Sequence, residues 1–305
     1  MSTKKKSKKS TSPFIVSPLV IVLTMVFLSL VSMLIFQKTF LIKTAFTQQV
    51  NPVPKIKEVV KTQPTKPAEK KAEEYVPQII GHQVRVPILM YHYIGENPDP
   101  KDTARNSISL GPTKFEEEMK YLRDNGYNTI TLDTLYPALK DLITLPNKSV
   151  ILTFDDGYMD FYYNAYPILS KYGLHATVFI PTNLMNQGYY LTWAQIKEMS
   201  SSGLITFGTH GVHHYHFTSL STQDLDFELS ESKKILQDNL GIPINFVAYP
   251  YGSANYSVIE ATKKAGYMGA LGTWANKIQS EGTLYNMPRL RIGGGLDLQN
   301  FINLL

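Results

Sequence analysis

From about residue 82 to the C-terminus, short apolar runs rich in β-branched residues alternate with segments that begin with helix-capping residues. This alternation predicts an α/β domain with a largely parallel sheet. The expected strands share a short apolar run between turn residues, and they cover 86–91, 129–132, 149–154, 176–180, 205–208, 246–248, 268–271 and 288–292. The expected helix starts share a hydroxyl or amide side chain that can cap the first turn: Thr113, Thr192, Ser221 and Asn255.

The N-terminal residues follow another pattern. A basic tail over residues 1–13 precedes an uncharged apolar run over 14–36. Such a run spans a bilayer, for which about 20 apolar residues are needed, and the lysines before it predict a cytoplasmic N-terminus. A cleaved signal peptide is the competing interpretation, but no clear small-x-small site occurs around Thr44 and Ala45. We therefore expect a single-pass signal anchor in the cell membrane, with the remainder of the chain extracellular.

Residues 37–81 are expected to form an extended, disordered linker. Pro, Lys, Glu, Gln and Thr dominate residues 48–78, and so few large apolar groups cannot bury enough surface to offset the entropy of ordering. The prolines favour a semi-extended chain. The domain expected over 82–305 can then stand away from the membrane.

The net charge of +5 belongs to the N-terminal part of the chain. Residues 82–305 carry 17 Lys and Arg against 21 Asp and Glu. A nucleic-acid-binding domain needs a basic face of its own, so this balance argues against nucleic acid as a partner. The chain has no cysteine, so any metal must be held by histidines and carboxylates.

Two adjacent carboxylates, Asp155 and Asp156, follow the apolar run at 150–152. They stand at the expected C-terminal end of a buried parallel strand, where α/β folds build their sites. Successive residues of a strand point to opposite sides, so one carboxylate can bind a cation while the other accepts a proton. Taken alone, Asp-Asp-Gly also fits a solvated turn.

Histidines are concentrated in one place: four of the seven lie within residues 210–216, directly after the expected strand at 205–208. His210 and His214 can converge on one metal if this segment turns helically. Neutral imidazole together with carboxylate suits Zn²⁺. Surface histidines are the alternative, but the carboxylate pair at the end of another strand favours a metal site.

These motifs resemble those of the polysaccharide deacetylases of carbohydrate esterase family 4, over roughly residues 85 to 305. The family's T-F-D-D-G motif is matched by residues 153–157, and its H-x-x-x-H motif by His210 and His214. The resemblance implies a distorted (β/α) barrel in which Asp155 is the general base. It also implies a divalent metal on Asp156, His210 and His214, with Zn²⁺ preferred to Co²⁺ or Ni²⁺.

The third motif of the family ends in P-Y-G, matched by Pro250 and Tyr251 with the following glycine. The resemblance implies that these residues line the acetate and oxyanion side of the site. Trp274 is assigned to the substrate side, although the Asp that usually precedes this tryptophan is missing. Ala248 stands where the family usually has an arginine that orients the base.

Another arginine is therefore expected to orient Asp155. Arg289 and Arg291 alternate along the expected strand at 288–292, so at most one of them faces inward. We favour Arg289, because the preceding proline fixes the chain's entry to the strand.

The general acid that a deacetylase of this family needs is expected near the start of the domain. The family's last motif, L-x-H, is missing, because no histidine follows His216. His92 instead ends the first expected strand. This order resembles the permuted subgroup that includes the biofilm poly-β-1,6-N-acetylglucosamine N-deacetylases, and it implies that His92 is the general acid. A core or turn histidine is the alternative.

The resemblance implies a hydrolase that removes acetyl groups from an extracellular N-acetylglucosamine polysaccharide, either exopolysaccharide or peptidoglycan. The metal would activate water and polarise the acetamide, Asp155 would take the proton of the water, and His92 would protonate the departing amine. Two alternatives stay open. One is an inactive, membrane-tethered carbohydrate-binding module, motivated by Ala248 and by the missing Asp before Trp274. The other is an esterase acting on O-acetyl xylan.

Overall fold

The structure is a computed structural model, and it describes residues 75–305. The anchor predicted at 14–36 and most of the predicted linker lie outside these residues. Within residues 75–305, none of the helices combines the length and the apolar character needed to cross a membrane.

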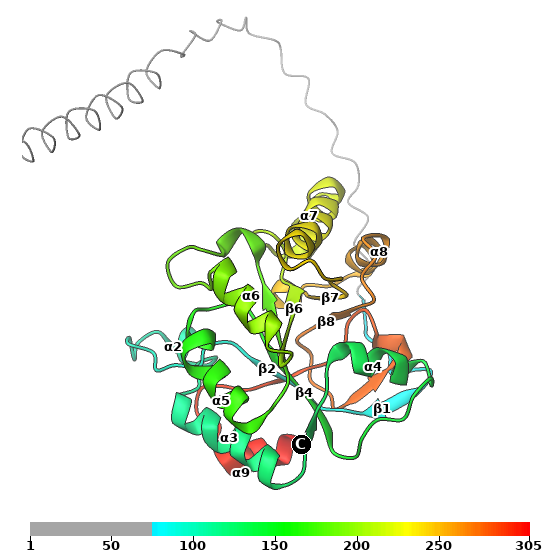
Figure 1. The fold of residues 1–305 in the computed structure, drawn as a ribbon. Helices are drawn as coiled ribbons and strands as arrows, with labels where there is room; N and C mark the ends of the chain where they lie inside the picture. Colours follow the sequence, from blue (N-terminus) through cyan, green and yellow to red (C-terminus); the bar gives the residue numbers. More distant parts are fainter. Residues whose placement is uncertain (1–74) are drawn as a thin grey trace, which may run out of the picture. The chain divides into compact units, whose positions relative to one another are not determined.

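A parallel sheet forms the centre of the domain (Figure 1). Its strand order is β10-β2-β4-β5-β6-β7-β8, with β3 beside the start of β4. The strands are β2 (Ile88–Tyr91), β3 (Asn128–Thr129), β4 (Ser149–Phe154), β5 (Ala176–Ile180), β6 (Ile205–Thr209), β7 (Phe246–Ala248), β8 (Gly269–Leu271) and β10 (Leu290–Arg291). The Gly272 N–H donates to the Met287 carbonyl at 2.9 Å, joining the end of β8 to the segment before β10. The sheet therefore curls round on itself, as expected of a distorted barrel.

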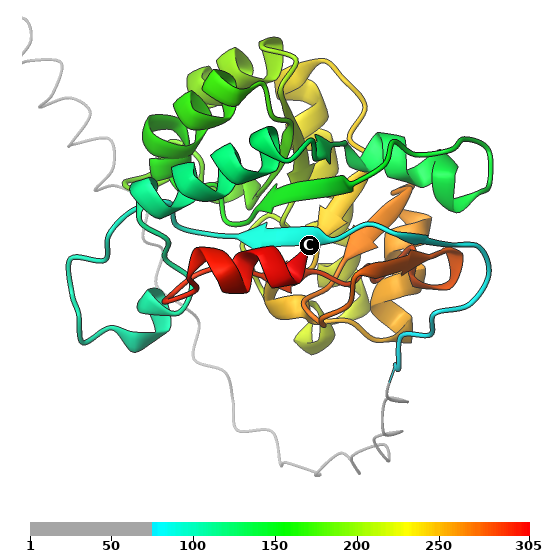
Figure 2. The same cartoon turned by 90° about the horizontal axis from the view of Figure 1, so that it is seen from below.

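Helices surround the sheet, as the view from below shows (Figure 2). They are α2 (Thr103–Asn106), α3 (Pro112–Asp124), α4 (Leu132–Leu139), α5 (Tyr166–Tyr172), α6 (Trp193–Ser201), α7 (Thr222–Leu240), α8 (Tyr256–Lys264) and α9 (Leu298–Leu304). A small antiparallel pair, β1 (Gln83–Arg85) with β9 (Ile278–Ser280), stands apart from the main sheet and was not expected from the sequence.

Side chains of β4 alternate between two apolar clusters. Val150 and Leu152 pack into the larger cluster with the helices, whereas Ile151 packs into the smaller cluster with residues of β2, β5, β7 and β8. Both faces of the strand are thus buried, which explains its unbroken apolar run. By the same alternation, Thr153 and Asp155 share a side with Ile151.

Several predicted elements are confirmed. The strands at 149–154, 176–180 and 246–248 match β4, β5 and β7 residue for residue. Thr192, Ser221 and Asn255 each cap a helix, and Thr192 forms a complete capping box with Gln195.

Other boundaries were wrong. The segment at 288–292 contributes only Leu290–Arg291 as strand, and the strand expected at 129–132 ends at Thr129, because Thr131 caps α4. Thr113 does not cap α3, which begins at Pro112 after Gly111. A proline at the first helical position has its φ angle preset and needs no N–H partner, so the helix starts there.

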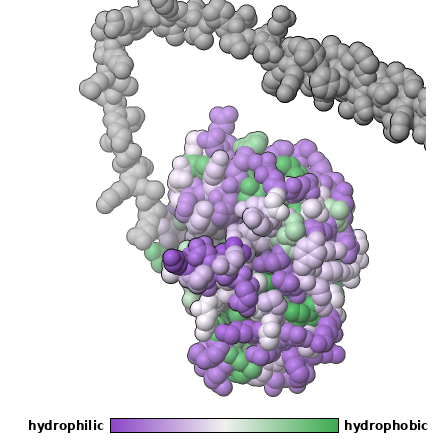
Figure 3. All heavy atoms as spheres, turned by 90° about the vertical axis from the view of Figure 1, so that its left-hand side faces the viewer, coloured by the Kyte–Doolittle hydropathy of each residue, from purple (hydrophilic) through white to green (hydrophobic). Residues whose placement is uncertain are grey.

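The molecular surface is mostly polar on the face shown in Figure 3, where apolar residues form small separate patches. The large apolar residues are instead concentrated in the two buried clusters. Buried polar residues are unusual in such an interior, so they indicate the position of a functional site.

Candidate active site and metal centre

Three strands deliver the predicted site residues to one edge of the sheet. His92 follows β2, Asp155 and Asp156 follow β4, and His210 follows β6. Because these strands are parallel, their carboxyl ends meet at the same edge, where open α/β sheets place their ligands.

Asp156, His210 and His214 converge on one point. Their ligand atoms all lie within 4.8 Å of one another. Asp156 Oδ1 is 3.3 Å from His210 Nε2 and 3.1 Å from His214 Nε2. This oxygen is buried and has no hydrogen-bond donor within residues 75–305. A carboxylate and two imidazole nitrogens fit a divalent cation such as Zn²⁺, which would satisfy all three ligand atoms.

The electrostatics of Asp156 suit a metal ligand. Burial alone would raise the pKa of this carboxyl group, but the His210 and His214 rings outweigh burial and hold the pKa well below its usual range. Asp156 is thus an anion at neutral pH, as a ligand must be.

A loop, not a helical turn, brings the two histidines together, so the helical explanation from the sequence was wrong. No helix is present between β6 and Phe217. Instead, Gly211 has φ of 76° and His214 has φ of 62°, both in the left-handed region. These reversals turn the chain so that residues four apart face the same point.

Ala248 contributes through its backbone. The carbonyl oxygen of Ala248 is 2.7 Å from His210 Nδ1. With Nδ1–H donated to this carbonyl, the tautomer is fixed and the lone pair of Nε2 faces Asp156. The strand β7 therefore orients a proposed metal ligand.

Asp155 is bound by Arg289 through both carboxylate oxygens. Nη1 donates to Oδ1 and Nη2 donates to Oδ2, each at 2.7 Å. Arg289 is fully buried, and it also donates to the Gly272 carbonyl at 2.8 Å and to Thr153 Oγ1 at 3.2 Å. Burial would raise the pKa of Asp155, but Arg289 and His210 bring it below its ordinary value. Arg291, by contrast, is exposed at the pocket rim.

His92 lies in the same pocket as the carboxylate pair. Its Nδ1 atom is buried and has no hydrogen-bond partner within the described residues. Burial lowers the pKa of His92, and Asp155 and Asp156 only partly offset that effect.

The pocket around these residues has a volume of about 500 Å³. Tyr251 lines it; this residue has φ of 60° and is 58% exposed. Two predicted substrate residues do not line it: Pro250 is buried, and Trp274 donates its indole N–H to the Asn286 carbonyl at 2.8 Å. Thr273 lines the pocket in place of its neighbour Trp274.

One wall of the pocket is aromatic, and Tyr158 in this wall was not recognised from the sequence. Tyr158 and Tyr190 both line the pocket and stack at 5.5 Å between ring centroids. Tyr93 also stacks on Tyr158, at 3.8 Å between ring centroids, and the Arg105 guanidinium lies 4.4 Å from the centre of the Tyr93 ring. Tyr158 directly follows the Asp-Asp-Gly motif, and this position was the one available signal.

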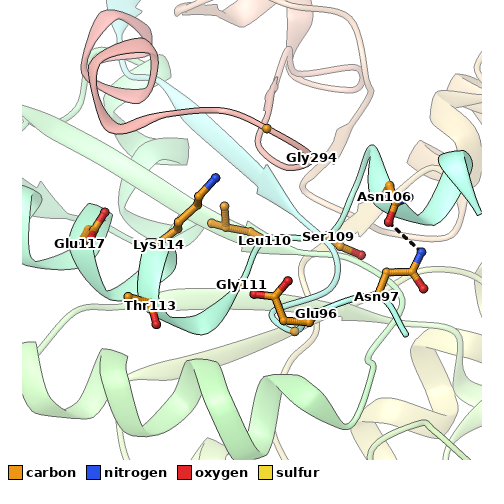
Figure 4. Close-up of a pocket in the computed structure, with 12 residues that line it drawn as sticks. Glu96, Asn97, Asn106, Ser109, Leu110, Gly111, Thr113, Lys114, Glu117 and Gly294 are labelled. Carbon is orange, nitrogen blue, oxygen red and sulfur yellow. Dashed lines mark hydrogen bonds between the residues drawn. The ribbon is translucent and has the colours of Figure 1, made fainter. Parts of the chain in front are cut away.

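A second pocket, of about 580 Å³, is lined in part by residues of the 106–111 segment (Figure 4). Glu117 and Lys114 of α3 lie on one side of it, and Asn97 bonds to Asn106 on the other at 2.8 Å. It contains neither a histidine nor any of the buried carboxylates, so the chemistry belongs to the pocket with Asp155 and Asp156.

The chain is similar to known proteins in sequence and in fold. The family model for polysaccharide deacetylase matches residues 143–270. YxkH of Bacillus subtilis (strain 168), which carries the name of that family, is 33% identical over 212 residues, covering 70% of this chain and 73% of YxkH. The chain belongs to the polysaccharide deacetylase family. The deacetylase is thus a hydrolase.

Two further relatives extend the comparison of this deacetylase. The poly-β-1,6-N-acetyl-D-glucosamine N-deacetylase of Staphylococcus aureus (strain MSSA476) is 29% identical over 226 residues, covering 69% of this chain and 76% of that protein. The solved structure of the Streptococcus pyogenes deacetylase PplD in complex with acetate is 31% identical. It matches with a TM-score of 0.68 and covers 73% of this chain and 99% of PplD.

The family model includes the carboxylate pair and both histidines of the proposed metal site, but it ends before Arg289 and begins after His92. These two residues therefore enter the site through the geometry described above.

Proposed function

We propose that this deacetylase is a metal-dependent N-deacetylase that acts on an extracellular N-acetylglucosamine polysaccharide and releases acetate. The observation that carries the proposal is the convergence of Asp156, His210 and His214 within 4.8 Å, beside a carboxylate held by Arg289. The name of the Staphylococcus aureus relative supports an N-acetylglucosamine polymer as substrate.

A divalent metal held by Asp156, His210 and His214 would supply Lewis-acid chemistry, polarising the acetamide carbonyl and making water a better nucleophile. Asp155 accepts the proton of the attacking water, because Arg289 keeps it ionised and fixes the direction of its oxygens. We assign the Tyr251 backbone N–H to the oxygen of the acetyl group, where negative charge develops.

His92 donates a proton to the departing amine, which would be too poor a leaving group as an anion. Because burial lowers its pKa, the imidazolium form of His92 is a stronger acid than an exposed imidazolium and gives up its proton more readily. The same shift keeps the protonated form scarce at neutral pH. Turnover should therefore depend on how much of His92 is protonated at the working pH.

The contacts of Asp155 argue against an inactive carbohydrate-binding module. That alternative arose because Ala248 replaces the usual arginine and because the usual Asp before Trp274 is missing. For the first of these, Arg289 supplies a bidentate guanidinium to Asp155 from the segment before β10. The Ala248 carbonyl in turn orients His210. These contacts would be unnecessary in a module that only binds sugar.

The decisive experiment measures acetate release by the zinc-loaded protein from a panel of substrates. The panel holds defined β-1,6-linked N-acetylglucosamine oligomers, peptidoglycan and O-acetyl xylan, with Asp155→Asn as the matched inactive control. Release from one of the N-acetylated glycans, dependent on Asp155, is expected. Release from O-acetyl xylan alone would identify an esterase, and no release from any substrate would support the carbohydrate-binding module.

We also propose that the domain acts outside the cell, tethered by residues 14–36 and the linker that follows. The support is the sequence pattern alone: a basic tail, an apolar run and a Pro-rich segment. Protease added to intact cells should release the domain by cutting between about residues 48 and 80. Protection of the domain from protease would reverse this orientation.

A further inference from the structure

The loop that carries the two proposed histidine ligands is bound by a buried carboxylate from α7. Glu228 is only 2% exposed. Its Oε2 atom accepts the backbone N–H of Val212 at 2.7 Å and that of His213 at 3.0 Å. These two residues lie between His210 and His214, so one side chain fixes the middle of the loop.

His213 completes this contact. Its Nδ1 atom is 2.6 Å from Glu228 Oε1, so both carboxylate oxygens are engaged by the loop. The His213 ring is nearly parallel to the rings of Tyr215 and Phe227, at centroid distances of 5.2 and 6.4 Å. His213 is therefore directed at α7 and not at Asp156.

The fit between loop and carboxylate is close. A Cβ atom added at Gly211 would lie 2.8 Å from Glu228 Oε2, so only glycine allows this approach. The backbone carbonyl groups of the loop are bonded as well: the Gly211 carbonyl accepts the Thr182 N–H at 3.1 Å, and the Val212 carbonyl accepts the Asn183 N–H at 3.0 Å. The loop is thus held from two sides, with Glu228 as the acceptor for its N–H groups.

Such support is needed because the loop lacks the regular bonds of a helix or strand. His214 has a left-handed backbone at φ of 62°, which a residue with a Cβ atom seldom adopts without support. Without Glu228, the N–H groups of Val212 and His213 would lose their acceptor. The loop could then relax and carry His214 away from Asp156.

We infer that Glu228 is a positioning residue for the metal centre: it holds residues 211–213 so that His210 and His214 meet Asp156. His213 assists as the partner of Glu228 and is not a ligand. This inference rests on the proposed function, because it requires that the three residues hold a metal. Loss of an outer partner of a ligand commonly weakens metal affinity by about 10- to 100-fold.

The test measures Zn²⁺ affinity of the metal-free full-length chain by competition with a chromogenic chelator. Glu228→Ala is expected to weaken Zn²⁺ binding by about 10- to 100-fold, and His213→Ala by less, because the backbone bonds to Glu228 remain. Glu228→Gln should retain most of the affinity, since an amide can accept from the backbone and donate to His213.

A matched control separates positioning from stability. Leu236 is fully buried on α7, about two helical turns beyond Glu228. Leu236→Ala should lower the melting temperature of the metal-free protein but leave Zn²⁺ affinity near that of the wild type. Equal Zn²⁺ affinity in Glu228→Ala and wild type, or equal weakening in Leu236→Ala, would overturn the inference. Failure of the wild type to bind Zn²⁺ would overturn the proposed metal site itself, and the inference with it.

Discussion

Arg289 binds Asp155 with two parallel hydrogen bonds of 2.7 Å, although the two residues are 134 positions apart in the chain. The remaining guanidinium contacts go to the Gly272 carbonyl and to Thr153 Oγ1. A planar guanidinium so fully bonded allows Asp155 little freedom to rotate. The proposed base is therefore oriented before substrate binds, which is what general-base catalysis requires.

Replacement of Arg289 by lysine should lower turnover by a factor of about 10 or more, since a misplaced general base loses part of a contribution of roughly 10² to 10⁴. Lysine keeps the charge but cannot form the bidentate contact. The measurement is steady-state acetate release, with bound zinc and melting temperature determined alongside. Arg291→Lys, at the exposed rim of the pocket, should lower turnover less than Arg289→Lys does. Equal turnover in Arg289→Lys and wild type would show that other contacts orient Asp155.

Removal of the metal should abolish acetate release, and added Zn²⁺ should restore it. His214→Ala should lose bound metal and activity together, because one of three ligands is gone. His216→Ala should keep its metal, since the His216 ring stacks on Tyr251 at 3.8 Å and is not part of the ligand set. Elemental analysis of the purified variants measures this difference. Metal loss in His216→Ala equal to that in His214→Ala would mean that the ligands are wrongly assigned.

Substitution of the proposed acid should affect rate without affecting metal content. His92→Ala should lower the turnover number by roughly 10² to 10⁴, the usual contribution of a positioned acid. Bound zinc should stay at the wild-type level, because His92 does not belong to the ligand set. A variant with normal turnover would return His92 to the role of a core or turn residue.

Glu118 should make stability depend on pH. Burial raises its pKa from 4.5 to about 8, although a hydrogen bond of 2.8 Å from the Tyr91 hydroxyl partly opposes the shift. Below pH 4.5 the carboxyl group is protonated in both folded and unfolded chains. As pH rises from 4.5 to about 8, the unfolded chain releases this proton more readily, so the folded state loses stability across that window.

Glu118→Gln removes this titration. The stability of Glu118→Gln relative to wild type should therefore rise between pH 4.5 and pH 8.5. The gain in the free energy of unfolding is on the order of a few kcal/mol at most, and the melting temperature should rise with it. Thermal unfolding at several pH values measures the difference. A constant difference for Glu118→Gln across the range would contradict a buried protonated carboxyl group.

Local patterns in the sequence were sufficient to predict the main strands and several helix caps. The runs at 149–154 and 176–180 were recognisable because strands buried on both faces are apolar at nearly every position. Thr192 and Asn255 were recognisable because a cap bonds within its own first turn. Strand β10 was overestimated, because its length depends on pairing with β2. The paired residues Leu290 and Leu89 are 201 positions apart in the chain, so this pairing cannot be seen in the local sequence.

The types of residue in the site were also determined by the sequence: two adjacent carboxylates, a histidine pair and a histidine at the end of the first strand. Alternation along the strand indicated that only one of Arg289 and Arg291 faces inward, but it could not show which one orients Asp155. The folded sheet determines this, because it buries Arg289 against Asp155 and leaves Arg291 at the pocket rim. Likewise, the spacing of His210 and His214 suggested a shared metal but not the loop that unites them. That loop depends on Glu228, a residue of a distant helix, and contacts between segments far apart in the chain exist only in the folded molecule.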